Sequence, residues 1–220
     1  MTSIVWFRQD LRVEDNPALC AAAKLGEPII PLFIWSPHEE MDWIPGGATK
    51  WWLHHSLRSL EEDLLKLGLN LVIRTGNSLE VLQQVIEETK ATSVFWNRRY
   101  EPAIIARDTK IKSALSHLNV QSFNASLLFE PWTICNKQKK PFQVFTPFWK
   151  TCLTMSIEGP QQTPAFCKGM KVKTESIDSL ALLPKIHWDS GIKAAWKPGA
   201  SQARIILIHF LEEHVDSYLE

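Results

Sequence analysis

Several features that would assign this chain of 220 residues to a familiar class are missing. No apolar run is long enough to cross a bilayer, and charged residues interrupt the first apolar run too early for a secretory signal peptide. The four cysteines have no C-x-x-C spacing, which predicts reduced thiols without a disulfide framework. We therefore expect a cytoplasmic protein.

Short motifs for phosphate binding, hydrolysis and metal binding are also absent. The chain has neither G-x-x-x-x-G-K-[ST] nor G-x-G-x-x-G, which disfavours nucleoside triphosphates and NAD. It has no G-x-S-x-G, and the spacing of His209 and His214 is not that of H-E-x-x-H, so no metal site is expected. The formal net charge is zero, without the basic excess of a free-standing nucleic-acid-binding protein.

The first 124 residues contain a regular alternation of expected strands and helices. Asn16 and Pro17 supply helix-start chemistry soon after the first apolar run, Gly68 is placed to end the second helix, and Ser78 to cap the third. Strands are expected at 4–7, 28–35, 69–74, 93–96 and 121–124, and helices at 17–25, 49–67, 79–90 and 103–118. This pattern predicts an α/β fold, a five-stranded parallel sheet with helices on both faces.

The pattern changes in the second half of the chain. Turn signals and aromatic residues at 129–145 suggest a hairpin or a long excursion, followed by a short helix at 147–155. Residues 158–197 contain several prolines and glycines and no sustained period, as a connector would. An amphipathic helix is expected at 201–219, with Ser201 as its cap, and it resembles the first element of a further domain.

Three expected strands are followed by polar or aromatic side chains at their carboxyl ends, where open parallel sheets form ligand crevices. Residues 8–12 contain two arginines and an aspartate, which either contact a ligand or form a strand-end salt bridge. The second candidate is residues 35–37, after the second expected strand. In the loop that follows them, the Gly46-Gly47 pair would let a ligand approach the backbone.

The third site candidate is residues 96–102. Its Asn97 and Glu101 side chains suit the edge of a heterocycle, and its aromatic residues suit stacking. The alternative interpretation is helix capping by Asn97 and a surface pair of arginine and glutamate.

Taken together, four segments resemble the N-terminal half of DNA photolyases and cryptochromes. They are VWFRQDLRVEDNPAL, GGATKWWLHHSL, WNRRYEP and FQVFTPFWK. Of these, GGATKWWLHHSL most resembles the bacterial class I photolyases that act on cyclobutane pyrimidine dimers. The resemblance implies a Rossmann-like antenna domain core at 1–130, an excursion completing it at 131–155, an interdomain linker at 156–198 and the start of a truncated FAD-binding helical domain at 199–220.

In this family the N-terminal domain carries an antenna chromophore, and the resemblance implies methenyltetrahydrofolate more readily than a deazaflavin. Excitation passes to FAD in the helical domain, and the reduced flavin donates an electron to a pyrimidine dimer flipped out of damaged DNA. No catalytic residue is expected in this chain, so it should not repair DNA alone. The antenna-site residues that the resemblance implies are Arg8, Trp35, Ser36, Trp43, Gly46, Gly47, Lys50, Trp51, Asn97, Arg98 and Glu101.

Two other functions stay open at this point. One is a cryptochrome-type blue-light photoreceptor, which the α/β domain does not distinguish from a photolyase. The other is a free-standing chromophore-binding or interaction module that self-associates through the apolar face of helix 201–219. No membrane partner is expected.

Overall fold

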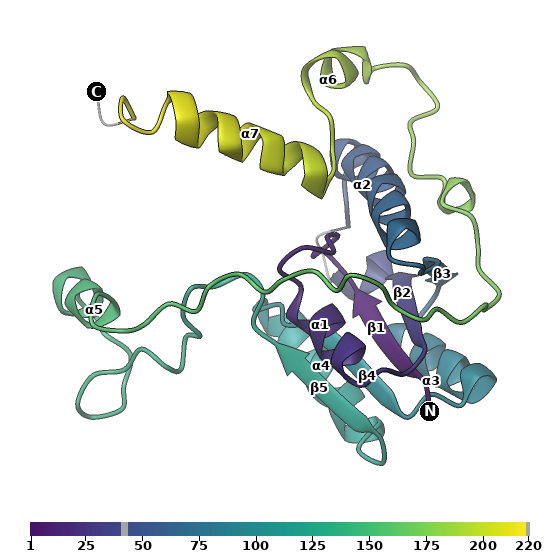
Figure 1. The fold of residues 1–220 in the computed structure, drawn as a ribbon, viewed down its shortest axis with the longest axis horizontal. Coiled ribbons are helices and arrows are strands. Elements are labelled where there is room, and N and C mark those ends of the chain that lie inside the picture. The colour runs from purple at the N-terminus through teal and green to yellow at the C-terminus, as the bar shows by residue number, and fades with distance from the viewer. Residues whose placement is uncertain (41–43, 219–220) are drawn as a thin grey trace.

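The computed structural model describes residues 1–40 and 44–218, and its centre is a sheet of five parallel strands (Figure 1). The spatial order is β3-β2-β1-β4-β5, so the chain builds outward from β1 in one direction and then returns to build in the other. The predicted α/β fold is confirmed. The strands are β1 (Ser3–Phe7), β2 (Ile29–Trp35), β3 (Val72–Thr75), β4 (Ser93–Asn97) and β5 (Asn119–Phe123).

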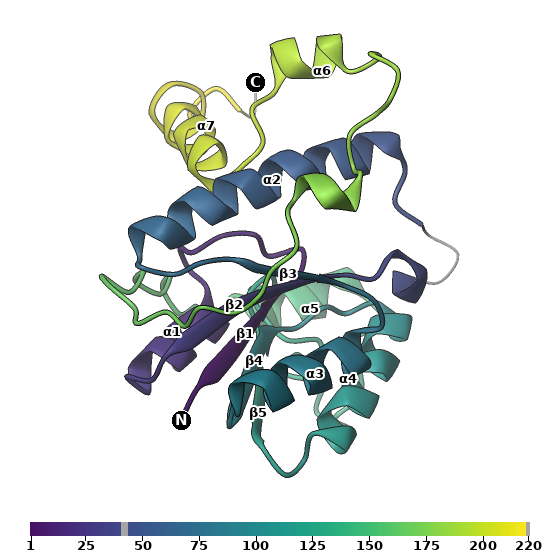
Figure 2. The same cartoon turned by 90° about the vertical axis from the view of Figure 1, so that its right-hand side faces the viewer.

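Helices cover both faces of the sheet, as predicted (Figure 2). On one face lie α1 (Pro17–Lys24) and α2 (Gly47–Lys66), and on the other lie α3 (Ser78–Thr89) and α4 (Pro102–Ala114). Alternate residues of β1 serve the two layers: Val5 packs towards α1 and α2, and Ile4 towards α3 and α4. Every residue of β1 is therefore buried.

Two predicted helix caps are wrong. Asn77 caps α3, because its side-chain oxygen accepts from the backbone N–H groups of Leu79 at 3.0 Å and Glu80 at 3.2 Å. The Ser78 hydroxyl instead donates to Glu39. At the last helix, Gly199 occupies the N-cap position, one residue before the helix begins, so Ser201 lies inside the first turn.

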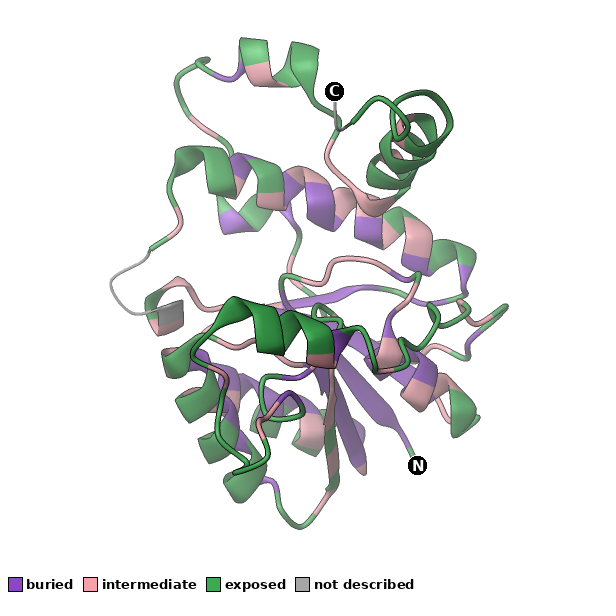
Figure 3. Cartoon of the chain, turned by 90° about the vertical axis from the view of Figure 1, so that its left-hand side faces the viewer, coloured by how far each residue is buried: buried purple, intermediate pink, exposed green. Residues whose placement is uncertain are grey.

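The remaining elements lie outside the sheet and the four helices that cover it. They are η1 (Pro37–Glu40), α5 (Phe145–Cys152), η2 (Asp178–Leu180), α6 (Ser190–Ala195) and α7 (Ala200–Glu213). Of these, α5, α6 and α7 are mostly exposed. Residues 124–144 contain no strand, so the excursion is present and the hairpin alternative is wrong. Figure 3 shows α5 and α7 exposed along most of their length, in contrast to the strands. Among the helices that the structure describes, none combines the length and the apolar character that a membrane-spanning helix needs.

The segment predicted to be a connector also contributes to the core. The backbone N–H of Ile29 donates to Lys168 O at 2.8 Å, and that of Cys167 donates to Leu67 O at 2.8 Å. Three apolar residues, Ile177, Leu180 and Leu182, are buried in the layer formed by α1 and α2. The sequence did not reveal this packing, because the segment contacts the core through isolated side chains and backbone hydrogen bonds. Such contacts leave no helical or strand period in the sequence.

Candidate functional site at the carboxyl edge of the sheet

A cavity of about 810 Å³ opens where β1 and β2 end. Its walls come from the last residues of these strands, from the residues that follow them and from the first two turns of α2 and α4. The volume is in the range of roughly 300–1,000 Å³ that small-molecule sites occupy. Apolar and aromatic side chains form much of the described lining, among them Phe33, Ile34, Trp35, Ile44, Leu53 and Ile104.

Two guanidinium groups flank one indole in this cavity. The Cζ atoms of Arg8 and Arg107 lie 5.0 Å and 4.9 Å from the centre of the Trp6 ring, within the range of cation–π attraction. Burial lowers the pKa of Arg8, and the charge of Asp108, 2.7 Å away, opposes that shift. Arg107 also contacts Asp108, at 3.0 Å. The site therefore contains two fixed cations beside an aromatic surface.

Glu39 is a cavity neighbour that the sequence analysis missed. It lies in η1, and its carboxylate accepts from the Ser78 backbone N–H at 2.8 Å and lies 3.4 Å from Arg107. The only local signal was its position shortly after a strand. These contacts tie η1 to α3 and α4 and so close one side of the cavity.

Helix α2 adds a further positive contribution. Its first turn contains no acidic residue, and Gly46, its N-cap, lines the cavity. The free N–H groups and the dipole of a helix N-terminus attract anions. The arginines and this helix end together favour a ligand that combines an aromatic body with an anionic group.

Glu101 is the N-cap residue of α4 and lines the same cavity. Burial alone would raise its pKa, but hydrogen bonds from Arg99, at 2.8 Å, and from nearby backbone N–H groups outweigh this, and the pKa is lowered. Glu101 is thus an ionised acceptor at neutral pH, suited to an N–H group on a ligand.

Five of the predicted site residues line this cavity, and Trp43 lies outside the described residues. The five are Arg8, Trp35, Ser36, Gly46 and Glu101. Gly47 and Lys50 are in the first turn of α2 but not in the lining. A Cβ atom added at Gly47 would lie 3.1 Å from Trp188, so this glycine makes room for an indole of the same chain.

Trp51 and Asn97 are engaged in contacts within the protein. The indole N–H of Trp51 donates to Asp189 at 3.0 Å, on the flank of α2 that residues 186–196 cover. The Asn97 amide donates to Asp10 at 2.6 Å and to Asn16 at 2.8 Å, and its oxygen accepts from a backbone N–H of α1. Asn97 therefore holds the ends of β1 and β4 against α1.

Arg98 faces another, smaller cavity of about 460 Å³, whose lining also includes Asn97 and Glu101. The Arg98 guanidinium is paired with Glu130 at 2.5 Å and lies 5.8 Å from the centre of the Trp132 ring. Tyr100 also donates to Glu130, at 3.0 Å, and burial raises its pKa. The surface arginine–glutamate pair predicted as an alternative is present between Arg99 and Glu101, at 2.8 Å, whereas Arg98 pairs with the buried Glu130.

Comparison with known proteins gives one consistent result. A family profile described as DNA photolyase matches residues 3–167. Cryptochrome-2 of Arabidopsis thaliana is 40% identical over 98% of this chain and 37% of that protein. The deoxyribodipyrimidine photo-lyase of Agrobacterium fabrum is 39% identical over 99% of this chain and 46% of that protein.

The crystal structure of a bacterial class III photolyase from Agrobacterium tumefaciens has the same fold, with a TM-score of 0.88 and 39% sequence identity. It matches 96% of this chain and 44% of that one. This similarity is to a class III photolyase, whereas the segment GGATKWWLHHSL suggested class I. The chain spans less than half the length of these relatives. It belongs to the DNA photolyase family, with relatives among both photolyases and cryptochromes, and it has the α/β fold of the N-terminal domain of that family.

Proposed function

We propose that this chain is the light-harvesting part of a photolyase that repairs cyclobutane pyrimidine dimers in DNA. Its cavity at the carboxyl edge of the sheet holds an antenna chromophore, methenyltetrahydrofolate rather than a deazaflavin. In the whole protein, α7 begins the helical domain that binds FAD and damaged DNA. The observation that carries the proposal is the cavity itself, which combines aromatic walls with two arginines over Trp6.

The residues present suit a folate. Its flat ring system matches the apolar and aromatic walls, and its carboxylate-bearing tail matches the arginines and the N-terminus of α2. Glu101 is the acceptor for ring N–H groups. The indole N–H of Trp6 and Nε of Arg8 have no hydrogen-bond partner in the described part of the chain, which leaves donors at this site unused.

The chromophore, when bound, supplies absorption in the near ultraviolet or blue and passes its excitation to the flavin. The protein's own residues bind and orient it. Trp35 and Leu53 exclude water from its ring, and Arg107, held by Asp108 and Glu39, fixes its anionic end. Because Arg107 is itself held by two carboxylates, little ordering is left to occur on binding.

A pair of matched variants on α4 tests the chromophore site. Ala103 lines the cavity, whereas Ala106 is exposed on the same helix outside the lining. We expect an absorption titration of the purified chain with methenyltetrahydrofolate to show binding that Ala103→Trp weakens roughly tenfold or more, a loss of about 1.4 kcal/mol. Ala106→Trp should bind like the wild type. No binding, or equal binding by both variants, would contradict the site.

The photolyase activity needs a separate test on the full-length protein. Irradiation with blue light should restore cyclobutane dimers in DNA to intact pyrimidines. The 40% identity to cryptochrome-2 favours a photoreceptor as the alternative. A full-length protein that binds flavin and responds to light but leaves dimers intact would establish that alternative and exclude repair.

A further inference from the structure

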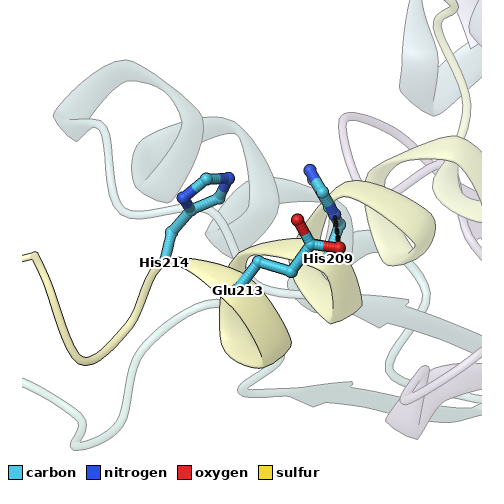
Figure 4. A group of neighbouring side chains, drawn as sticks. All are labelled: His209, Glu213 and His214. Atoms are coloured by element: carbon cyan, nitrogen blue, oxygen red, sulfur yellow. Dashed lines mark ion pairs between the residues drawn. The ribbon is translucent and has the colours of Figure 1, made fainter.

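We propose that the end of α7 is a binding site for a divalent transition-metal ion such as Zn²⁺, formed by His209, Glu213 and His214. Each of these residues offers one ligand atom, and the three atoms lie within 4.8 Å of one another (Figure 4). The site lies apart from the cavity and does not depend on the function proposed for it.

The positions of these side chains follow from local backbone geometry. His209 and Glu213 are four residues apart and share one face of α7, where His209 Nδ1 lies 3.2 Å from Glu213 Oε1. Two ligands of one tetrahedral zinc ion, each at about 2.0–2.1 Å, are separated by about 3.3 Å. The pair is therefore already at the spacing that a shared ion requires.

His214 would point to a different side if the helix continued through it, because five residues correspond to about 140° beyond a full turn. The helix instead ends here: His214 is the C-cap, with φ −127° and ψ −14°. This bend brings its ring to 5.1 Å from the His209 ring, centre to centre. The Ser217 hydroxyl donates to His214 O at 3.2 Å, which helps hold the turn.

The electrostatic surroundings favour a cation. The carbonyl end of a helix carries a partial negative charge, and the last turn of α7 contains no basic residue to offset it. Glu212 and Glu213 both lie in that turn, and Asp216 follows two residues after the cap. A bound divalent ion would neutralise this accumulation of negative charge.

The donor set selects the type of ion. Two imidazoles and one carboxylate suit Zn²⁺, Ni²⁺ or Cu²⁺, whereas Mg²⁺ and Ca²⁺ prefer oxygen ligands alone. Three protein ligands leave coordination positions for water. All three residues are exposed, so an ion can reach them.

The test uses the chain prepared without a histidine tag and titrated with Zn²⁺ by calorimetry, and with Co²⁺ by visible absorption. We expect one ion per chain and no binding of Mg²⁺. His209→Ala and His214→Ala should each weaken Zn²⁺ affinity roughly 10–100-fold. His117→Ala, at another exposed histidine, should leave it unchanged.

Three results would overturn the site. One is the absence of Zn²⁺ binding. Another is equal affinity of the wild type and the two variants, with folding verified by circular dichroism. The third is binding that disappears when the free thiols are alkylated but survives both histidine substitutions, since the ion would then be held by cysteines.

Discussion

Arg8 and Asp108 are 100 residues apart in the sequence, yet their side chains meet at 2.7 Å where β1 ends beside α4. Both are buried. A buried charge that loses its partner is costly, because neither water nor another group replaces the interaction. This ion pair therefore couples the stability of the sheet edge to the shape of the cavity.

We expect Asp108→Ala to lower the free energy of unfolding by about 3 kcal/mol, measured by urea denaturation. The double variant Arg8→Met with Asp108→Leu should recover part of that loss, because it removes both buried charges. Glu87→Gln, at an exposed position of α3, serves as a control with little effect. A small loss in Asp108→Ala would show that the pair contributes little to stability.

Two adjacent histidines of α2 should make stability depend on pH. Burial lowers the pKa of both His54 and His55 below the ordinary 6.5. The unfolded chain then takes up protons more readily than the folded chain, so the free energy of unfolding is greatest above about pH 6.5 and falls below it. Urea denaturation at several pH values measures this slope.

Replacing both histidines with glutamine should flatten the slope between about pH 7 and about pH 5. The exposed His117→Gln variant should keep the wild-type slope. If the double variant retained that slope, the titrating groups would lie elsewhere.

Gly68, just after α2, should tolerate no side chain. Its φ is +82°, and an added Cβ would lie 2.5 Å from the Phe166 ring and 2.9 Å from Cys167 O. Gly26 has a similar φ of +66° with open space around it. We expect Gly68→Ala to lower the free energy of unfolding by about 2 kcal/mol or more, and Gly26→Ala to lower it by about 1 kcal/mol. The melting temperature of Gly68→Ala should therefore fall further than that of Gly26→Ala. Equal losses would mean that residues 166–167 move aside freely.

Helix α7 presents an apolar face to solvent, on which Ile205, Ile208 and Leu211 follow one another at helical spacing and are all exposed. We expect the chain to self-associate through this face, because burying it removes apolar surface from water. Sedimentation velocity should show dimers that Ile205→Lys weakens. Ile186→Lys, at an exposed site outside α7, should not weaken them, and a monomer at every concentration would contradict the prediction.

Local signals in the sequence were enough to predict the strands and helices of the first 124 residues and the class of fold. Alternating apolar runs, Asn16 with Pro17 at the start of α1 and Gly68 after α2 are local signals, and each acts over a few residues. The four photolyase-like segments pointed to the same family that the comparisons show. The strand ends also located the region of the cavity, since parallel strands bring their carboxyl ends to one edge.

Which side chains face the cavity depends on how the strands and helices pack in three dimensions. Trp51 and Leu53 are two residues apart on α2, yet one is covered by residues 186–196 and the other lines the cavity. Asn97 was predicted to contact a ligand from its place after a strand, but its amide donates to Asp10 and Asn16. These outcomes depend on contacts between residues far apart in the chain. The packing of strands and helices decides whether a side chain faces a ligand or another part of the protein, and no local pattern in the sequence records that packing.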